Sequence, residues 1–423
     1  MRSSYKPIGR FIRLVKTRNA GLEVTELRGI RINKEFMPSV ANVIGTDLEN
    51  YKVVRKNQFA YNPMHVGRDG ILPIAQLDSE EPVIVSPAYV VFEIGNPDEL
   101  LPEYLMMWCR RPEFDRQAWF TTDSSVRGGF DWKDFCEMEM PVPSPEKQRE
   151  IVAEYETVVK RIALNEKLGR KLEETAQAIY KHWFVDFEFP MSDEDAKKLG
   201  RPELEGKTYQ SSGGEMVMCE KLNTAKPVLW GTQSLSQCID KTSSITYGVV
   251  KPGSADPDGV KFVRSGDLLN GRILTDQLRT IESEVSDHYR RTLLSGGEVL
   301  LSIVGNPGQV AIVPASLKGA NIARQVALLK MRDSDIALFI KSFLLSPIGR
   351  DALGVITLGS VQKVINLKDL RNLPVLLPSP EHFKKFGKIS EITESLSNSL
   401  HRQIELLDKI RLLLFARMTR LKD

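Results

Sequence analysis

The fold of this chain depends most on the stretch from Ser144 to Pro190, SPEKQREIVAEYETVVKRIALNEKLGRKLEETAQAIYKHWFVDFEFP. Ser144 can accept hydrogen bonds from the free backbone amides of a helix start, and Pro145 suits the first helical position. Apolar residues then recur at alternating steps of four and three, a heptad seam interrupted at Asn165 and Gly169. The pattern predicts a helix about 60 Å long whose apolar stripe needs a partner.

The same chain supplies a partner for this stripe. A second run begins at Ser379, and it aligns with the first without a gap at an offset of 235 residues. Upstream, the segment from Thr121 aligns in the same way with the segment from Ile356, and Lys133-Asp134 matches Lys368-Asp369. A common helix-start motif would explain the shared Pro-Ser-Pro-Glu alone, whereas this match continues on both sides of it. The sequence therefore predicts two copies of one module, with the two long helices packed antiparallel.

The blocks before each helix contain short apolar runs bounded by Gly, Pro, Asn or Asp, which predict strands, together with short helices. We expect an α/β (α+β) fold with mixed sheets: two globular domains separated by two long antiparallel helices, related by an internal pseudo-twofold repeat. A stretch rich in charge, Gly and Ser is typical of a linker. The expected limits are 1–143 for the first domain, 144–190 for the central long helix, 191–225 for the linker, 226–378 for the second domain and 379–423 for the distal long helix.

The composition excludes several protein classes. The hydrophobic content of 42% and charged content of 27% are ordinary for a soluble protein, and no apolar run has the length of a membrane span or a signal peptide. Four cysteines are scattered without metal-ligand spacing, which favours a reducing cytoplasm. The net charge of +3 indicates that any nucleic-acid surface must arise from local arrangement.

Signs of catalysis are missing from the sequence. Asn62-Pro63-Met64-His65 and Asn306-Pro307-Gly308 lack the aromatic residue of an amino-methyltransferase clamp, and five histidines are dispersed. Gly206-Lys207-Thr208 follows the preceding glycine, Gly200, at the wrong spacing for a phosphate loop. We expect no catalytic residue, no metal site and no cofactor bound by this chain.

Sequence reading of DNA requires polar and basic side chains on rigid loops, beside glycines that allow close backbone approach. Taken singly, each candidate is best explained as an ordinary polar turn residue; taken together, the equivalent loops in the two blocks favour a role in DNA reading. The candidates are Lys56, Asn57, Asn62, Arg68, Ser125, Arg127, Tyr247, Lys251, Arg264, Ser302, Asn306, Gln309, Arg324, Gln325, Ser360, Gln362 and Lys363. The candidates for the helix seam and subunit interface are Ile151, Val158, Ile162, Leu172, Ile179, Leu400, Leu407 and Leu414.

Several fragments resemble a known family, the specificity (S) subunits of type I restriction–modification systems. They are AIYKHWFVDFEFP from Ala178, GKTYQSSGGEM from Gly206, SITYGVVKPG from Ser244, VKFVRSGDLLNGRI from Val260 and both Pro-Ser-Pro-Glu helix starts. The resemblance covers essentially the whole chain. It identifies the two blocks as target-recognition domains and the two long helices as the family's conserved helices.

The resemblance implies a non-catalytic, cytoplasmic DNA-binding subunit that reads a bipartite, asymmetric target on double-stranded DNA. The helices would set the spacer between the half-sites, as protein geometry does in other DNA readers. Its partners would be type I methyltransferase (M) subunits, two in number, and through them restriction (R) subunits. S-adenosylmethionine, ATP and Mg²⁺ are expected on those partners, and no membrane is expected.

Two questions remain open at this level. Asn165 and Gly169 either set the register of the helix pair or mark a weak point in its packing. The alternative function is a non-catalytic cytoplasmic coiled-coil scaffold with two protein-binding domains, which a lack of salt-sensitive DNA affinity would favour.

Overall fold

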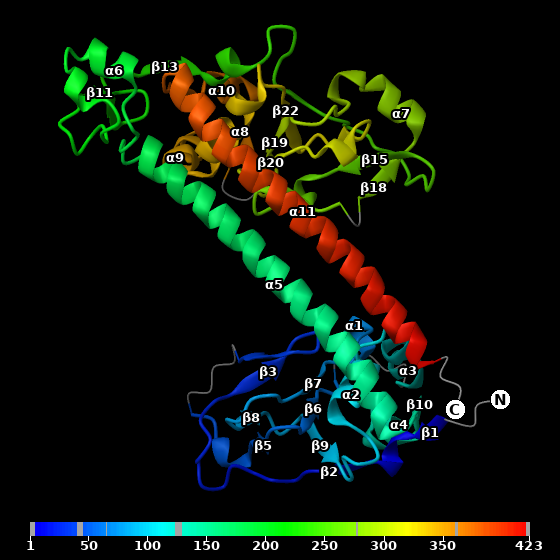
Figure 1. Ribbon diagram of the computed structural model, residues 1–423. Helices are drawn as coiled ribbons and strands as arrows, with labels where there is room; N and C mark the ends of the chain where they lie inside the picture. Colours follow the sequence, from blue (N-terminus) through cyan, green and yellow to red (C-terminus); the bar gives the residue numbers. More distant parts are fainter. Residues whose placement is uncertain are drawn as a thin grey trace. The chain divides into compact units, whose positions relative to one another are not determined.

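The computed structural model describes residues 5–39, 45–64, 66–122, 129–275, 278–359 and 363–419 (Figure 1). The chain forms two compact units: unit 1 comprises Met1–Asn165 and Arg402–Asp423, and unit 2 comprises Glu166–His401. The long helices α5 (Pro145–Phe184) and α11 (Pro380–Met418) each contribute one half to each unit. No helix among the described residues is both long enough and apolar enough to cross a membrane.

Unit 1 is built around a four-stranded antiparallel sheet in the order β2-β9-β6-β7. These strands are β2 (Ile12–Leu14), β9 (Val90–Ile94), β6 (Phe59–Tyr61) and β7 (Ile74–Gln76). Three further antiparallel pairs are β1 (Tyr5–Pro7) with β10 (Glu139–Pro141), β3 (Arg28–Ile30) with β4 (Phe36–Pro38), and β5 (Lys52–Val54) with β8 (Val83–Val85). The short helices are α1 (Val66–Asp69), α2 (Pro102–Cys109), α3 (Pro112–Thr121) and α4 (Trp132–Glu137), with 3₁₀ turns η1 (Ile8–Arg10) and η2 (Leu48–Asn50).

The core of unit 1 includes one face of α5. Ile151, Tyr155 and Ile162 are buried together with α2 and with the end of α11, where the ring of Phe415 lies 5.5 Å from that of Tyr155. Each large apolar side chain buried in this way stabilises the fold by about 1.5–3 kcal/mol. The heptad seam of α5 therefore packs against both the domain and the second helix.

Unit 2 repeats this plan. Its four-stranded antiparallel sheet has the order β14-β22-β19-β20, with β14 (Thr246–Tyr247), β22 (Val326–Leu329), β19 (Val299–Ser302) and β20 (Val310–Ile312). A three-stranded sheet contains β18 (Arg279–Ile281), β15 (Val260–Val263) and β21 (Asn321–Ile322). The two-stranded pairs are β11 (Met216–Cys219) with β12 (Thr224–Pro227), β13 (Gly231–Ser234) with β25 (Pro374–Leu377), β16 (Leu268–Leu269) with β17 (Arg272–Ile273), and β23 (Thr357–Leu358) with β24 (Val364–Ile365).

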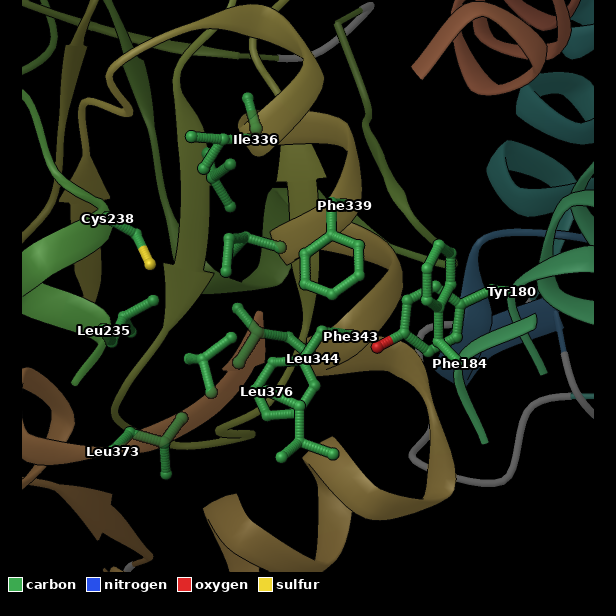
Figure 2. Close-up of a cluster of buried hydrophobic side chains, with 14 of the residues drawn as sticks. Tyr180, Phe184, Leu235, Cys238, Ile336, Phe339, Phe343, Leu344, Leu373 and Leu376 are labelled. Carbon is green, nitrogen blue, oxygen red and sulfur yellow. The ribbon is translucent and has the colours of Figure 1, made fainter. Parts of the chain in front are cut away.

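The helices of unit 2 cover this framework. They are α6 (Asp193–Lys198), α7 (Ser283–His288), α8 (Ser334–Leu345), α9 (Pro347–Val355) and α10 (Leu367–Asn372). The 3₁₀ turns are η3 (Pro202–Leu204), η4 (Leu235–Cys238), η5 (Ser265–Asp267), η6 (Arg290–Thr292) and η7 (Ala315–Leu317). In the core, Tyr180 and Phe184 of α5 lie beside Phe339 of α8, with ring centroids 5.5 and 5.1 Å away (Figure 2).

The internal repeat of the amino-acid sequence is also present in the positions of the helices and strands, which confirms the predicted fold class. Helix α10 lies at the same 235-residue offset from α4 as α11 does from α5, and α9 and β25 follow α3 and β10 in the same way. One hydrogen bond has a counterpart in each unit: the Phe130 amide donates to Pro63 O (3.0 Å), just after β6, and the Ile365 amide donates to Ile303 O (2.9 Å), just after β19. The two donors lie at the 235-residue offset, whereas the two acceptors lie 240 residues apart.

The expected mixed sheets are wrong for the main sheets. Both four-stranded sheets are wholly antiparallel, and among the named strands described by the structure only β15 and β21 pair in parallel. In each sheet one pair joins consecutive strands, β6 with β7 and β19 with β20, and such neighbours commonly pair antiparallel. The other pairs join strands that lie far apart in the sequence.

The expected linker at 191–225 is also corrected, because this segment is packed into unit 2. Met191, Leu204 and Tyr209 are buried, and the ring of Tyr209 stacks on Phe189 with centroids 4.8 Å apart. Gly214 allows this approach, since a Cβ atom there would lie 2.4 Å from the Tyr209 ring. The segment lacks a regular apolar period because single residues, and not one face of an element, enter the core.

Candidate nucleic-acid interface

In unit 2 the chain connections converge at one end of the four-stranded sheet. Strands β14 and β19 end there, while β22 and β20 begin there, because neighbouring strands are antiparallel. We call the described segments 247–251, 303–309 and 323–325, with Lys363, the loop end of unit 2. Segments far apart in sequence thus meet on one side of a rigid sheet.

Backbone hydrogen bonds tie these segments to one another. The Arg324 amide donates to Val249 O (3.0 Å), and the Ile303 amide donates to Gln325 O (2.8 Å). Val304 also forms a bridge with Val364, which brings Lys363 to the same group of loops. These hydrogen bonds fix the loops relative to the sheet, as is required of a surface that must distinguish one binding partner from another.

Gly248 is essential for this convergence. A Cβ atom on Gly248 would lie 1.8 Å from Ile322 O, so any side chain would push the two segments apart. The close approach allows the Val249 amide to donate to Ile322 O at 2.8 Å. As a result, Tyr247 and Arg324 emerge from segments in direct contact.

The candidates gathered at the loop end are mainly exposed. Tyr247, Lys251, Asn306, Arg324 and Lys363 are exposed, whereas Gln309 and Gln325 are half-buried. Among the described residues, none of the three cations has an ion-pair partner there. Such cations can neutralise phosphates, and amide side chains can pair with base edges in the major groove.

Arg264 lies at the same end, since its neighbour Val263 pairs with Ile322. Its guanidinium is already engaged: Nε lies 3.2 Å from Asp267 Oδ2 and Nη2 lies 3.0 Å from Oδ1. This pairing raises the pKa of Arg264 above its ordinary value through hydrogen bonds and charge attraction. The carboxylate offsets the charge of Arg264, so Arg264 orders the loop more than it attracts phosphate.

Ser302 is corrected as a contact candidate, because its side chain is fully buried. Its hydroxyl donates to Asn306 O (2.5 Å) and accepts a hydrogen bond from the Gln309 amide (2.9 Å). The hydroxyl therefore closes the β19–β20 turn from inside and presents Asn306 and Gln309. The sequence did not reveal this role, because a buried and an exposed serine look alike in a turn.

In unit 1 the candidates do not all meet. Asn62 follows β6 at the equivalent end of the sheet, where its Oδ1 accepts a hydrogen bond from the Met64 amide (3.0 Å). Arg68 lies in α1 within the same β6–β7 connection. Lys56 and Asn57 instead precede β6, at the opposite end, where the Asn57 amide donates to Leu77 O (2.8 Å) and Lys56 pairs with Glu80. The strand length separates the two pairs.

Four further candidates, Ser125, Arg127, Ser360 and Gln362, lie outside the described residues. Sequence reasoning missed three other cations near the loop end. A hollow of about 1160 Å³ there is lined by Arg170 of α5, Arg272 of β17 and Arg350 of α9, with Gln309 and Lys363. No local signal identifies these arginines, because tertiary packing alone brings them to the hollow.

The seam candidates differ in burial between the helix halves. Ile151, Val158, Ile162 and Leu414 are buried in unit 1, together with half-buried Leu407. Leu172, Ile179 and Leu400 are half-buried in unit 2. Their assignment to a subunit interface stays a prediction.

Among the described residues, no three His, Cys, Asp or Glu side chains are grouped as a metal site would require.

The sequence is similar to those of characterised proteins, although no family model matches it. It is 26% identical over 266 residues to the type I restriction enzyme EcoBI specificity subunit of Escherichia coli, covering 63% of this chain and 53% of that protein. The chain thus spans about half the length of that relative. It is 22% identical over 438 residues to the HindI specificity subunit of Haemophilus influenzae, covering 92% and 91%.

Among solved structures, the chain is similar to the S subunit of a type I restriction–modification system from M. genitalium. That similarity has a TM-score of 0.51 at 12% identity and covers 98% of this chain and 95% of that one. At this identity the similarity concerns the fold, which the two proteins share.

Proposed function

We propose that this chain, a relative of the specificity subunits of type I restriction enzymes, is a DNA-recognition subunit that reads a bipartite, asymmetric target. In this proposal each unit carries one target-recognition domain, and each domain reads one half-site. The chain then directs M subunits, and through them R subunits, to that target.

The observation that carries the proposal is the repeated link between the sheet end and the loop before the short helix. In unit 1 the Phe130 amide donates to Pro63 O, and in unit 2 the Ile365 amide donates to Ile303 O. Equivalent loops therefore occupy equivalent places on two copies of one framework. A duplicated framework is suited to reading two half-sites.

The asymmetry of the target follows from the contents of these loops. Asn62 and α1 occupy the β6–β7 connection of unit 1, whereas Asn306 and Gln309 occupy the shorter β19–β20 turn of unit 2. Different side chains on the same framework read different bases. The two halves of the target are therefore expected to differ in sequence.

Chemistry is assigned to the partners in this proposal. The chain binds no cofactor, and S-adenosylmethionine, ATP and Mg²⁺ act on the M and R subunits. Its four cysteines are free thiols, which agrees with a reducing cytoplasm as its place of action. In this proposal two M subunits bind to faces of α5 and α11 that are exposed in this chain.

The test is to co-express the chain with the M subunit from its own operon and to map methylated adenines across the genome. The expected result is one split motif with two short, different halves and a fixed gap. Methylation without any motif from a stable complex would contradict the proposal. DNA affinity that does not change with salt would favour a protein-binding scaffold instead.

A further inference from the structure

The hairpin β16–β17 of unit 2 reaches the helix pair through a tight turn. Asn270 and Gly271 both have positive φ, 48° and 78°, as a two-residue hairpin turn requires. Arg272 follows directly and starts β17. Its side chain leaves the recognition domain and contacts both long helices.

The contacts of Arg272 are specific. Nη2 donates to Ser397 Oγ of α11 at 2.7 Å, and Nη1 lies 3.2 Å from Nδ1 of His401. On α5, a Cβ atom at Gly169 would lie 2.9 Å from Nη2. The guanidinium of Arg272 therefore fills the space that a side chain at position 169 would occupy. At this break in the heptad seam, the hairpin β16–β17 packs against the helix.

A second cation of the same domain lies beside this contact. Lys341 of α8 is 5% exposed, and its Nζ lies 2.6 Å from Glu394 of α11 and 3.9 Å from Glu173 of α5. A Cβ atom on Gly271 would lie 3.5 Å from Lys341 Cε, so the two contacts adjoin. This contact adds little net stability, because the cost of removing Lys341 from water offsets its attraction to the two carboxylates.

Unit 1 lacks this polar contact at the repeat-equivalent positions. Met106 stands where Lys341 stands in unit 2, and Ile404 corresponds to Gly169. Both are apolar, and both pack in or against the core of unit 1. Apolar contacts are non-directional, whereas hydrogen bonds from a planar guanidinium fix an orientation.

We propose that Arg272, seated against Gly169 and supported by Lys341, is a positioning residue that fixes the second recognition domain on the helix pair. It thereby sets which spacer length the protein accepts, without contacting bases. This inference rests on the proposed function. A domain that can tilt on the helices accepts half-sites at more than one separation.

The test uses the full chain in complex with its M subunit, on targets with the mapped half-sites and with spacers of the natural length and one base pair shorter or longer. Arg272→Met keeps the aliphatic stem and removes the guanidinium. We expect unchanged bases in both half-sites and a loss of about tenfold in discrimination against altered spacers, since a charge-assisted hydrogen bond is lost. Arg291→Met is the matched control, because Arg291 of η6 is exposed, belongs to the same unit and is outside the candidate interface.

Gly169→Leu, which fills the same space from α5, should reproduce the Arg272→Met result. Hydrogen–deuterium exchange supplies a measurement independent of methylation. In Arg272→Met, exchange should rise in 268–273 and around Ser397 of α11, but not in the Arg291→Met control.

Three results would overturn the inference. The first is an active Arg272→Met complex with unchanged discrimination between spacers. The second is a changed base preference in the second half-site. The third is an inactive Arg272→Met complex in which hydrogen–deuterium exchange in 268–273 is unchanged. Failure of the proposed function is distinct, because the wild-type complex would then give no split motif at all.

Discussion

Asn165 of α5 donates a hydrogen bond from Nδ2 to Gln403 Oε1 of α11 at 3.1 Å, inside unit 1. Asn165 is fully buried, yet its Oδ1 has no hydrogen-bond partner among the described residues. Its partner Gln403 is exposed. Burying Asn165 therefore costs free energy, because its amide group is removed from water and only partly hydrogen-bonded. The hydrogen bond forms only when Asn165 of α5 lies opposite Gln403 of α11, which supports a role in setting the register of the helices over a simple packing defect.

Replacing Asn165 by Leu should stabilise unit 1 by about 1 kcal/mol, because an unsatisfied buried oxygen disappears and Gln403 can turn to water. The same change should weaken the specification of the helix pair, with higher-order oligomers appearing. Thermal unfolding and light scattering measure both effects. Lys167→Leu, at an exposed position of α5, is the control and should not stabilise the protein; a lower melting temperature for Asn165→Leu would contradict the prediction.

Ser302→Ala should reduce affinity for the second half-site without removing any contact to DNA. The Ser302 hydroxyl makes two hydrogen bonds within the β19–β20 turn, and their loss leaves the partly buried Asn306 carbonyl and Gln309 amide unpaired. We expect a loss of about 1–3 kcal/mol in the free energy of unfolding. Denaturant unfolding and DNA binding check this prediction. Ser244→Ala, at an exposed position, is the control, and equal effects of both changes would refute it.

Arg324→Ala and Lys363→Ala should each weaken DNA binding and lower the salt dependence of log K by about 1, since each cation neutralises one phosphate. The measurement is a titration of the complex with target DNA at several salt concentrations. Lys318→Ala is the matched control. Lys318 is exposed and follows β20, at the opposite end of the sheet, so its removal should leave the slope unchanged. The same dependence of log K on salt for all three variants would show that the loop end does not contact the DNA phosphates.

His382 should make the stability of unit 2 depend on pH. Its ring is fully buried, with Nδ1 2.7 Å from Ser379 Oγ and Nε2 3.0 Å from Pro190 O. Burial lowers the pKa of His382 below its ordinary value, although the Pro190 carbonyl and the nearby Asp195 and Glu381 carboxylates oppose this shift and Lys385 supports it.

Because the pKa of His382 is lower in the native state than in the unfolded state, the unfolded state binds the proton first as the pH falls. The stabilisation is therefore complete above about pH 6.5 and is lost as the pH falls towards the native pKa. Chemical unfolding from pH 7.5 to 5 measures the slope. His382→Asn should be less stable at pH 7.5 and should have a smaller slope in this window; an unchanged slope would assign the dependence to other groups.

Several features of the fold could be read from local sequence patterns. The 3.5-residue period and the Ser-Pro-Glu starts predict helices, and α5 and α11 begin one residue after Ser144 and Ser379. The expectations that failed concern longer distances. Residues 191–225 have no period, yet Tyr209 reaches the core by stacking on Phe189. The sheets are antiparallel because of the order in which strands pair, which composition does not specify.

The sequence by itself determined the duplicated plan of this protein, because a gapless repeat and a heptad seam are properties of consecutive letters. Only the tertiary structure decided which side chains meet. Val249 and Arg324 share a hydrogen bond across a long stretch of chain, Ser302 turns inward, and Arg272 occupies the space left by Gly169. These outcomes depend on strand pairing and on the space between packed elements, and both quantities arise only when the chain has folded.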